Sequence, residues 1–151
     1  MKNQLFDLTK KVSLITGGNG GIGLGMAKGL ASYGSDIAII GRNIEKNSKA
    51  KEELVQYGVR VETYSIDVSN ENDVKETVAN IVNDFGRIDT VFANAGMNLF
   101  GGSFEDMDTD VYRKVLAVNL DGVFFTLRES CKHMVERAKN GDPGGSLVGV
   151  A

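Results

Sequence analysis

The chain has 151 residues, of which 42% are hydrophobic and 25% charged, an ordinary composition for one globular domain with a buried core. Its formal net charge of −3 provides no basic footprint for nucleic acid, and no apolar run approaches the roughly 20 residues of a membrane helix. The polar segment 1–11 does not resemble a signal peptide, and a single cysteine, Cys131, cannot form an internal disulfide. We therefore expect a cytoplasmic protein without a nucleic-acid or membrane partner.

Short apolar runs alternate along the chain with segments of helical periodicity. We predict strands at 12–16, 36–40, 59–66, 88–93 and 145–150, and helices at 22–33, 44–57, 69–85, 108–116 and 121–137. Ser69 is expected to cap the third helix. This alternation predicts a single α/β domain over 1–151 with a doubly wound, parallel sheet of the Rossmann type and helices on both faces. The expected strand order, 3-2-1-4-5, leaves the fifth strand at an edge.

A glycine-rich segment, T-G-G-N-G-G-I-G at 16–23, lies between the first predicted strand and the first helix. In that position a glycine turn lets the backbone approach a pyrophosphate, and the helix amino terminus supplies free N–H groups. Taken alone, such a segment is equally consistent with a flexible turn. It is not a Walker loop, because no Gly-Lys-Ser/Thr follows. Its working glycines are Gly17, Gly21 and Gly23.

The pattern T-G-x-x-x-G-I-G resembles the short-chain dehydrogenase/reductase family, and three later landmarks extend the resemblance over essentially the whole chain. Residues 93–96 (A-N-A-G) are similar to the family's N-N-A-G, with Ala93 in place of the first Asn. Asp67-Val68 matches its acidic position near adenine, and Asn119 matches the Asn of its catalytic tetrad. The segments 5–9 and 41–43 look like those of its sugar-acid (gluconate-type) dehydrogenases. The cofactor-binding residues that the resemblance implies are Thr16, Gly17, Asn19, Gly21, Ile22, Gly23, Arg42, Asp67, Val68, Asn94, Ala95 and Gly96.

The end of the second predicted strand bears on the choice of nicotinamide cofactor. An acid there accepts hydrogen bonds from the adenine ribose in many dinucleotide folds, whereas this chain has Gly41-Arg42-Asn43. A guanidinium binds a 2′-phosphate in forked geometry, so Arg42 favours NADP(H), with NAD(H) as the alternative. Arg42 is also consistent with stacking on adenine or facing solvent. Relatives that prefer NADP often place Arg or Lys at the position of Gly20, and this chain does not.

The resemblance implies hydride transfer between an alcohol and a ketone, with a Ser, a Tyr-x-x-x-Lys pair and an Asn as catalytic groups. No tyrosine in the chain has Lys four residues later, and the matched serine position falls one residue beyond Ala151. The carboxy-terminal catalytic part is therefore absent from 1–151, and we expect this chain to be inactive. Asn119 is its one tetrad member, with a purely structural amide as the alternative.

Two other classes stay open: a dinucleotide-binding module without catalysis, and a fragment without function of its own. A methyltransferase also has a glycine loop after its first strand, but that reading explains neither 93–96 nor Asn119. The family's substrates imply a small alcohol or ketone, and nothing in the chain specifies which one.

The remaining reactive residues have simpler explanations. His133 lacks partners at metal-ligand spacing, so no metal site is predicted. Cys131 is read as a small packing residue rather than a nucleophile, and the acids at 105–110 as a solvated helix start. The resemblance also implies a homo-oligomer through helix 121–137, with the exposed edge of the fifth strand as an alternative contact. The apolar candidates for that helix contact are Val123, Phe124, Leu127 and Met134.

Overall fold

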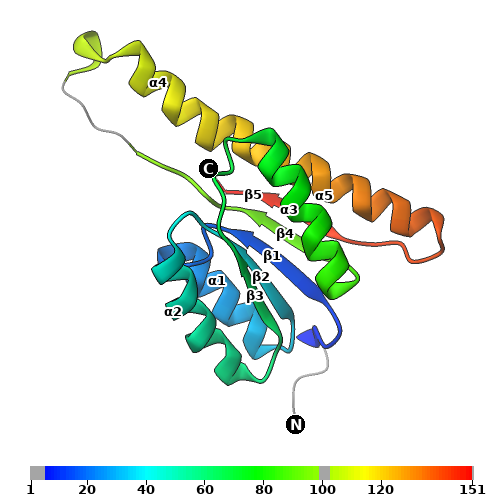
Figure 1. Ribbon diagram of the computed structural model, residues 1–151. Coiled ribbons are helices and arrows are strands. Elements are labelled where there is room, and N and C mark those ends of the chain that lie inside the picture. The colour runs from blue at the N-terminus through cyan, green and yellow to red at the C-terminus, as the bar shows by residue number, and fades with distance from the viewer. Residues whose placement is uncertain (1–5, 99–102, 151) are drawn as a thin grey trace.

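A computed structural model describes residues 6–98 and 103–150. Its centre is a five-stranded parallel sheet in the order β3-β2-β1-β4-β5 (Figure 1). The strands are β1 Val12–Thr16, β2 Asp36–Ile40, β3 Val61–Tyr64, β4 Thr90–Ala93 and β5 Ser146–Gly149. The predicted strands, their parallel pairing and their order are confirmed, although the last three are shorter than predicted.

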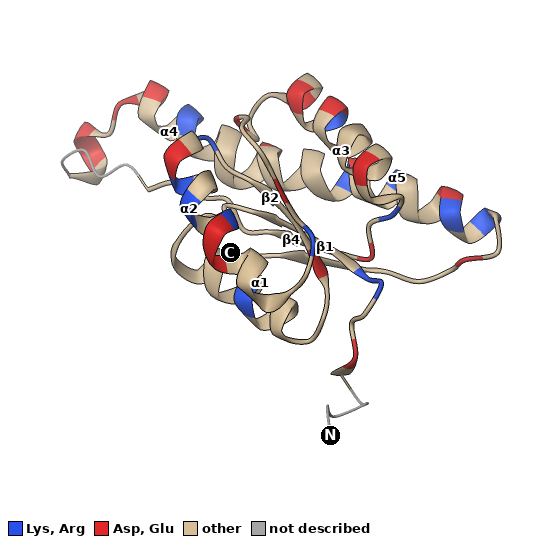
Figure 2. Cartoon of the chain, turned by 60° about the horizontal axis from the view of Figure 1, so that its bottom comes forward, with Lys and Arg blue, Asp and Glu red and all other residues tan. Residues whose placement is uncertain are grey.

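Helices cover both faces of this sheet, as predicted. They are α1 Gly21–Ser32, α2 Ile44–Leu54, α3 Glu71–Phe85, α4 Thr109–Leu116 and α5 Gly122–Lys139. Helices α1 and α2 pack on one face, and α3 and α5 on the other (Figure 1). Charged residues lie mainly on helices and connecting segments, and β1 carries none (Figure 2). No helix among the described residues is long and apolar enough to cross a membrane.

Two local predictions about the helices are wrong. Asn70, not Ser69, caps α3: its side-chain oxygen accepts from the N–H groups of Asn72 and Asp73, while the Ser69 hydroxyl donates to Asp67. The predicted break between the fourth and fifth helices is replaced by a π-helical turn, Ala117–Asp121, that joins α4 and α5 into one helical run. Both departures involve the local hydrogen-bond pattern, which hydrophobic periodicity does not report.

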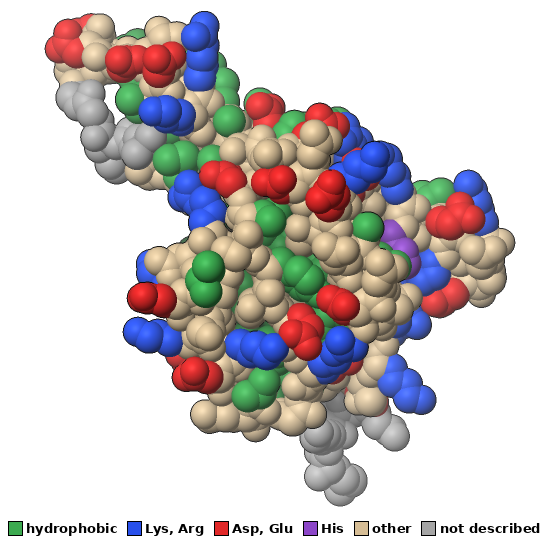
Figure 3. All heavy atoms as spheres, in the orientation of Figure 1, with side chains coloured by type: hydrophobic (Ala, Val, Ile, Leu, Met, Phe, Trp, Pro, Cys, Tyr) green, Lys and Arg blue, Asp and Glu red, His purple; other side chains and the backbone are tan. Residues whose placement is uncertain are grey.

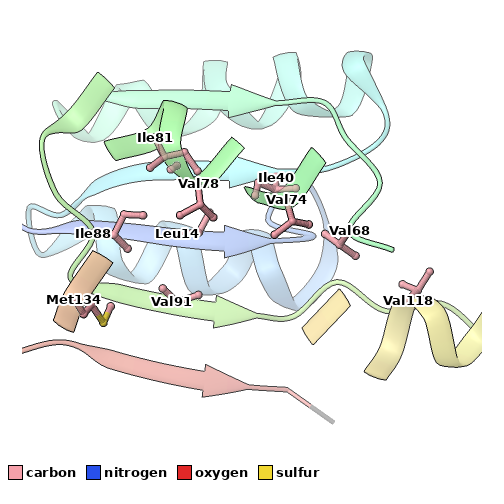
Figure 4. Close-up of a cluster of buried hydrophobic side chains, with 11 residues drawn as sticks. Leu14, Ile40, Val68, Val74, Val78, Ile81, Ile88, Val91, Val118 and Met134 are labelled. Carbon is pink, nitrogen blue, oxygen red and sulfur yellow. The ribbon is translucent and has the colours of Figure 1, made fainter. Parts of the chain in front are cut away.

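Side-chain alternation along the strands divides the core into two clusters. Leu14 and Val91 point toward α3 and α5, where they meet Val78 and Ile81 (Figure 4). Ile15 points to the opposite face, into the cluster beneath α1 and α2. Because each strand of the β1–β2 pair contributes to both clusters, these strands read as continuous apolar runs.

The fifth strand is far less covered than the first. All residues of β1 are buried, whereas none of β5 is, and Leu147 is 38% exposed. In the described part of the chain β5 pairs only with β4. The prediction that Met134 belongs to an oligomer surface on helix 121–137 is wrong, because Met134 is buried in the monomer. Its side chain packs under Gly145, where a Cβ would lie 2.5 Å from the Met134 sulfur.

The amino ends of β1 and β4 are joined through the buried carboxylate of Asp89. It accepts from the Val12 N–H at 3.0 Å, from two Arg87 nitrogens at 2.7 and 2.6 Å, and from Arg137 at 3.1 Å. These donors hold the pKa of Asp89 at about 2, even though burial alone raises it. His133 has a structural partner here, since its Nε2 accepts from the Ile88 N–H at 3.2 Å. This end of the sheet is therefore occupied by paired charges.

Candidate dinucleotide-binding site

The opposite, carboxyl end of the sheet holds a cavity of about 420 Å³. It lies where the chain order reverses, with β2 on one side of β1 and β4 on the other, the position at which doubly wound sheets bind ligands. Its lining residues are Gly17, Asn19, Gly20, Gly21, Ile40, Gly41, Arg42, Asn43, Lys46, Ile66, Asp67, Val68, Asn94, Ala95, Gly96 and Val118.

Most of the predicted cofactor residues are in that lining, and three are not. Thr16, Ile22 and Gly23 lie behind or beside the cavity rather than on its wall. Sequence reasoning missed Lys46, because a lysine in a charge-rich helix carries no sign of facing a ligand. It also missed the apolar wall residues Ile40, Ile66 and Val118, which read only as core positions.

The glycine loop adopts backbone conformations that require glycine. Gly17 and Gly21 have φ of +67° and +49°, in the left-handed region that other residues rarely adopt. A Cβ on Gly23 would collide with the Gly17 carbonyl oxygen and lie 2.6 Å from Asn94 Nδ2. By contrast, a Cβ on Gly20 or Gly21 would meet nothing within 4 Å. The loop is thus tight toward the protein and open toward the cavity.

The amino terminus of α1 differs from those of the other helices that begin after a loop. Asn43, Asn70 and Asp108 cap α2, α3 and α4 with side-chain oxygens, whereas the residue before α1, Gly20, provides no side-chain cap. The first turn of α1 also contains no acidic residue. Its free N–H groups and positive dipole end are therefore available to an anion in the adjoining cavity.

Thr16 joins the carboxyl ends of β1 and β4. Its buried hydroxyl oxygen accepts from the N–H groups of Asn94 and Ala95 at 3.0 and 2.9 Å. In return, Asn94 Nδ2 donates to the Thr16 carbonyl at 3.0 Å. These bonds hold the start of the 93–96 segment against the glycine loop. Thr16 thus positions the cavity wall from behind.

Asn19 is held in place by Asn47, a residue that the sequence does not mark as part of the site. Its Nδ2 donates to Asn47 Oδ1 at 2.7 Å, and Asn47 Nδ2 donates to the Gly41 carbonyl at 2.8 Å. Asn47 is 3% exposed. The chain of amides ties the glycine loop to the end of β2, so the two walls of the cavity keep a fixed spacing.

Three charged groups lie around the β2 side of the cavity. Arg42 Nη1 is 3.4 Å from Asp67 Oδ2, and the other oxygen of Asp67 accepts from the Ser69 N–H and hydroxyl. Burial raises the pKa of Asp67, but the Ser69 hydrogen bonds and Arg42 outweigh it, so the pKa is below its usual value and the group is ionised at neutral pH. Lys46 forms no ion pair with any residue that the structure describes.

Asn119 lies in the π-helical turn and clamps the segment after β4. Its Oδ1 accepts from the Met97 N–H at 2.8 Å, and its Nδ2 donates to the Met97 carbonyl at 3.0 Å. The side-chain amide is therefore committed to backbone, as a positioning residue beside Gly96. π-Turns are frequent at functional sites, and this one puts Asn119 within reach of the cavity wall.

No tyrosine among the described residues lines this cavity. Tyr64 donates to Asp84 Oδ2 at 2.5 Å, and burial together with that bond raises its pKa above the ordinary value, which is opposite to what a phenol acting as a base near neutral pH needs. No cluster of His, Cys, Asp or Glu suited to a metal occurs in 6–98 or 103–150. The acids at 105–110 gather at the free end of α4 (Figure 3), where Asp108 caps the helix.

Comparison with known proteins defines the class. The family model for short chain dehydrogenases matches residues 11–150, and the chain belongs to this family of oxidoreductases. It is 36% identical to sorbose reductase of Schizosaccharomyces pombe, over 97% of this chain and 56% of that protein. It is 33% identical to gluconate 5-dehydrogenase of Gluconobacter oxydans, over 97% of this chain and 55% of that protein, in line with the gluconate-type resemblance.

A solved structure agrees with these relatives. NAD+-bound xylitol dehydrogenase superimposes with a TM-score of 0.89 at 35% identity, over 95% of this chain and 54% of that one. The chain spans about half the length of the relatives it matches.

Proposed function

We propose that this chain is the dinucleotide-binding half of an oxidoreductase that interconverts a small alcohol and its ketone, with NADP(H) preferred over NAD(H). The observation that carries the proposal is the uncapped amino terminus of α1, which adjoins the open side of the glycine loop. A pyrophosphate matches this surface in charge and in hydrogen-bond demand.

The residues present fit such a cofactor. The Gly17–Gly23 backbone and the α1 N–H groups would hold the pyrophosphate, Asp67 and Val68 the adenine side, and residues 94–96 the nicotinamide side. When bound, the nicotinamide supplies hydride exchange with the substrate carbon. The chain's own contribution is to bind and orient the cofactor, with Thr16 and Asn119 positioning the wall after β4.

The preference for NADP(H) rests on charge. Arg42 and Lys46 both line the cavity beside the end of β2, and the segment that follows β2, Gly41-Arg42-Asn43, contains no acid of the kind that accepts ribose hydroxyls in many dinucleotide folds. Arg42→Asp is expected to weaken NADPH binding roughly 10- to 100-fold, because a charge-assisted hydrogen bond is lost, and to spare NADH binding. Titration of nicotinamide fluorescence measures this cleanly, since the chain contains no Trp. Arg113→Asp, on exposed α4, is the matched control, and equal loss for both cofactors would refute the preference.

Catalysis needs a proton donor at the carbonyl oxygen, and no tyrosine in 6–98 or 103–150 lines the cavity. The 151-residue chain is therefore expected to bind NADPH without oxidising it in the presence of sugar-type ketones. Binding without turnover separates this proposal from a fragment without function, which would bind nothing. A purely non-catalytic module would also bind NADPH without turnover. Adding a carboxy-terminal half that carries Ser and Tyr-x-x-x-Lys distinguishes the two, because restored turnover would exclude the non-catalytic module.

We also propose self-association through the exposed face of α5. Phe124 and Val135 are 55% and 49% exposed there and, with Leu127 and Leu147, line an apolar groove, a kind of patch that marks contact sites. Phe124→Glu should lower the molar mass measured by light scattering, whereas Val55→Glu, on the opposite side of the sheet, should leave it unchanged. A monomeric wild type at high concentration would contradict this.

A further inference from the structure

The Arg42–Asp67 ion pair lies at the part of the cavity where NADP(H) and NAD(H) differ. Both side chains line the cavity and are partly exposed, 60% for Arg42 and 40% for Asp67. Asp67 is held in place by Ser69, whose N–H and hydroxyl bond its other oxygen at 3.0 and 2.8 Å. The carboxylate is therefore the fixed partner, and the long arginine side chain is the one that can move.

We propose that Asp67 is a specificity-determining residue, which holds Arg42 and so weakens binding of a 2′-phosphorylated adenosine relative to the unphosphorylated one. The proposal rests on the proposed function, because it assigns an effect to a residue of the same cavity. A 2′-phosphate competes with Asp67 for the Arg42 guanidinium, whereas a 2′-hydroxyl leaves the ion pair intact. Asp67 thereby narrows the preference for NADP(H) that Arg42 and Lys46 create.

The size of the effect follows from the exposure of the pair. Exchange of one anionic partner for another at an exposed guanidinium changes affinity modestly, about 2- to 5-fold for a pair of this kind. A dianionic phosphate also binds more strongly than a carboxylate, so the ion pair reduces 2′-phosphate binding but does not prevent it.

The test uses adenosine fragments, which need neither nicotinamide nor catalysis. Calorimetric titration with 2′,5′-ADP and with 5′-AMP compares wild type with Asp67→Asn, which retains an oxygen for the Ser69 N–H. We expect the ratio of 2′,5′-ADP affinity to 5′-AMP affinity to be about 2- to 5-fold higher for Asp67→Asn than for wild type, because a change in the adenine contact affects both fragments alike. Glu76→Gln, an exposed residue of α3 outside the cavity lining, removes the same charge and should change neither.

A double-mutant cycle with Arg42→Gln tests whether Asp67 acts through Arg42. In the Arg42→Gln background, Asp67→Asn should no longer change the ratio of 2′,5′-ADP affinity to 5′-AMP affinity. A gain of the same size in that background, or an equal change for both fragments, overturns the proposal. If Asp67→Asn does not fold by circular dichroism, Asp67→Ser also keeps an oxygen acceptor and replaces it.

The failure of this inference is distinguishable from failure of the proposed function. Binding of both fragments with no effect of Asp67→Asn overturns the role of Asp67 alone. Binding of neither fragment by the folded wild-type chain overturns the dinucleotide site and the inference together.

Discussion

The two ends of the parallel sheet differ in whether their charged and polar groups are paired within the protein. At the amino ends of β1 and β4, Asp89 is 6% exposed and bonded by arginines and backbone. At the carboxyl ends, an open cavity is lined by glycine backbone, an uncapped helix terminus and Lys46, which pairs with no acid in the described part of the chain. At the amino end the polar groups are hydrogen-bonded within the chain, as in a structural network. At the carboxyl end the α1 N–H groups and Lys46 are available to a ligand, as in a binding site.

The largest expected effect would break the amino-end network. Asp89→Asn leaves Arg87 and Arg137 without their buried counter-charge and is expected to lower the free energy of unfolding by about 3 kcal/mol, measured by urea denaturation. Asp142→Asn is the control, because Asp142 contacts the same two arginines but is 50% exposed and should cost less than about 1 kcal/mol. Equal effects of the two variants would show that burial does not set the strength of this network.

A second change breaks the carboxyl end. Gly23→Ala puts a Cβ against the Gly17 carbonyl, so the glycine loop must shift. Overpacking of this kind costs about 1–3 kcal/mol. Because the shifted loop is part of the cavity, we expect NADPH affinity to fall roughly 10-fold or more. Gly25→Ala, two residues on in α1 where a Cβ meets nothing within 4 Å, should bind NADPH normally. Normal binding by Gly23→Ala would contradict the close-packed role of this glycine.

Acid should weaken the Asp89 network at the amino end of the sheet. The folded-state pKa of Asp89 is about 2, below the ordinary 3.8, so its contribution of about 2 kcal/mol is fully present above roughly pH 4 and is lost as the pH falls toward 2. Urea midpoints at pH 5 and pH 3 should therefore differ more for wild type than for Asp89→Asn. A pH dependence of the same size in both proteins would assign it to other carboxylates.

The smallest expected effect sharpens the contrast between helix termini. Asn70→Ala removes the side-chain cap of α3 and should cost about 1 kcal/mol in the free energy of unfolding, with NADPH affinity unchanged. The matched change Gly20→Asn gives α1 a capping side chain, so it should raise stability or leave it unchanged while weakening NADPH binding. Unchanged binding by Gly20→Asn would mean that the free α1 terminus does not contact the cofactor.

Much of this molecule follows from its sequence because the strands are short, and because the two central strands β1 and β2 are largely apolar and are each followed by glycine. The alternation of short apolar runs with segments of helical periodicity predicted the five strands and their order. The position of Gly17, Gly21 and Gly23 after the first strand predicted where the cavity lies. Contacts between distant side chains do not appear in periodicity. Asn47 and Lys46 sit in a helix that reads as solvated, and Met134 reads as exposed until Gly145 is seen to cover it.

The π-turn is the other feature that the sequence does not reveal. Residues 117–121 have good helical periodicity on both sides, and a single extra residue per turn is below what hydrophobic spacing can distinguish. The family resemblance marked Asn119, but not that its amide would be fully used on Met97.

The position of β1 at the centre of the sheet has a consequence for how the chain is made. β1 pairs with β2 on one edge and with β4 on the other, so its second edge has no partner until the ribosome has released residues 90–93. During that interval the nascent chain presents an unpaired, uncharged and largely apolar strand, the kind of edge that recruits chaperones or other chains. Slower translation between residues 16 and 93 lengthens this interval and is therefore expected to lower the yield of folded protein.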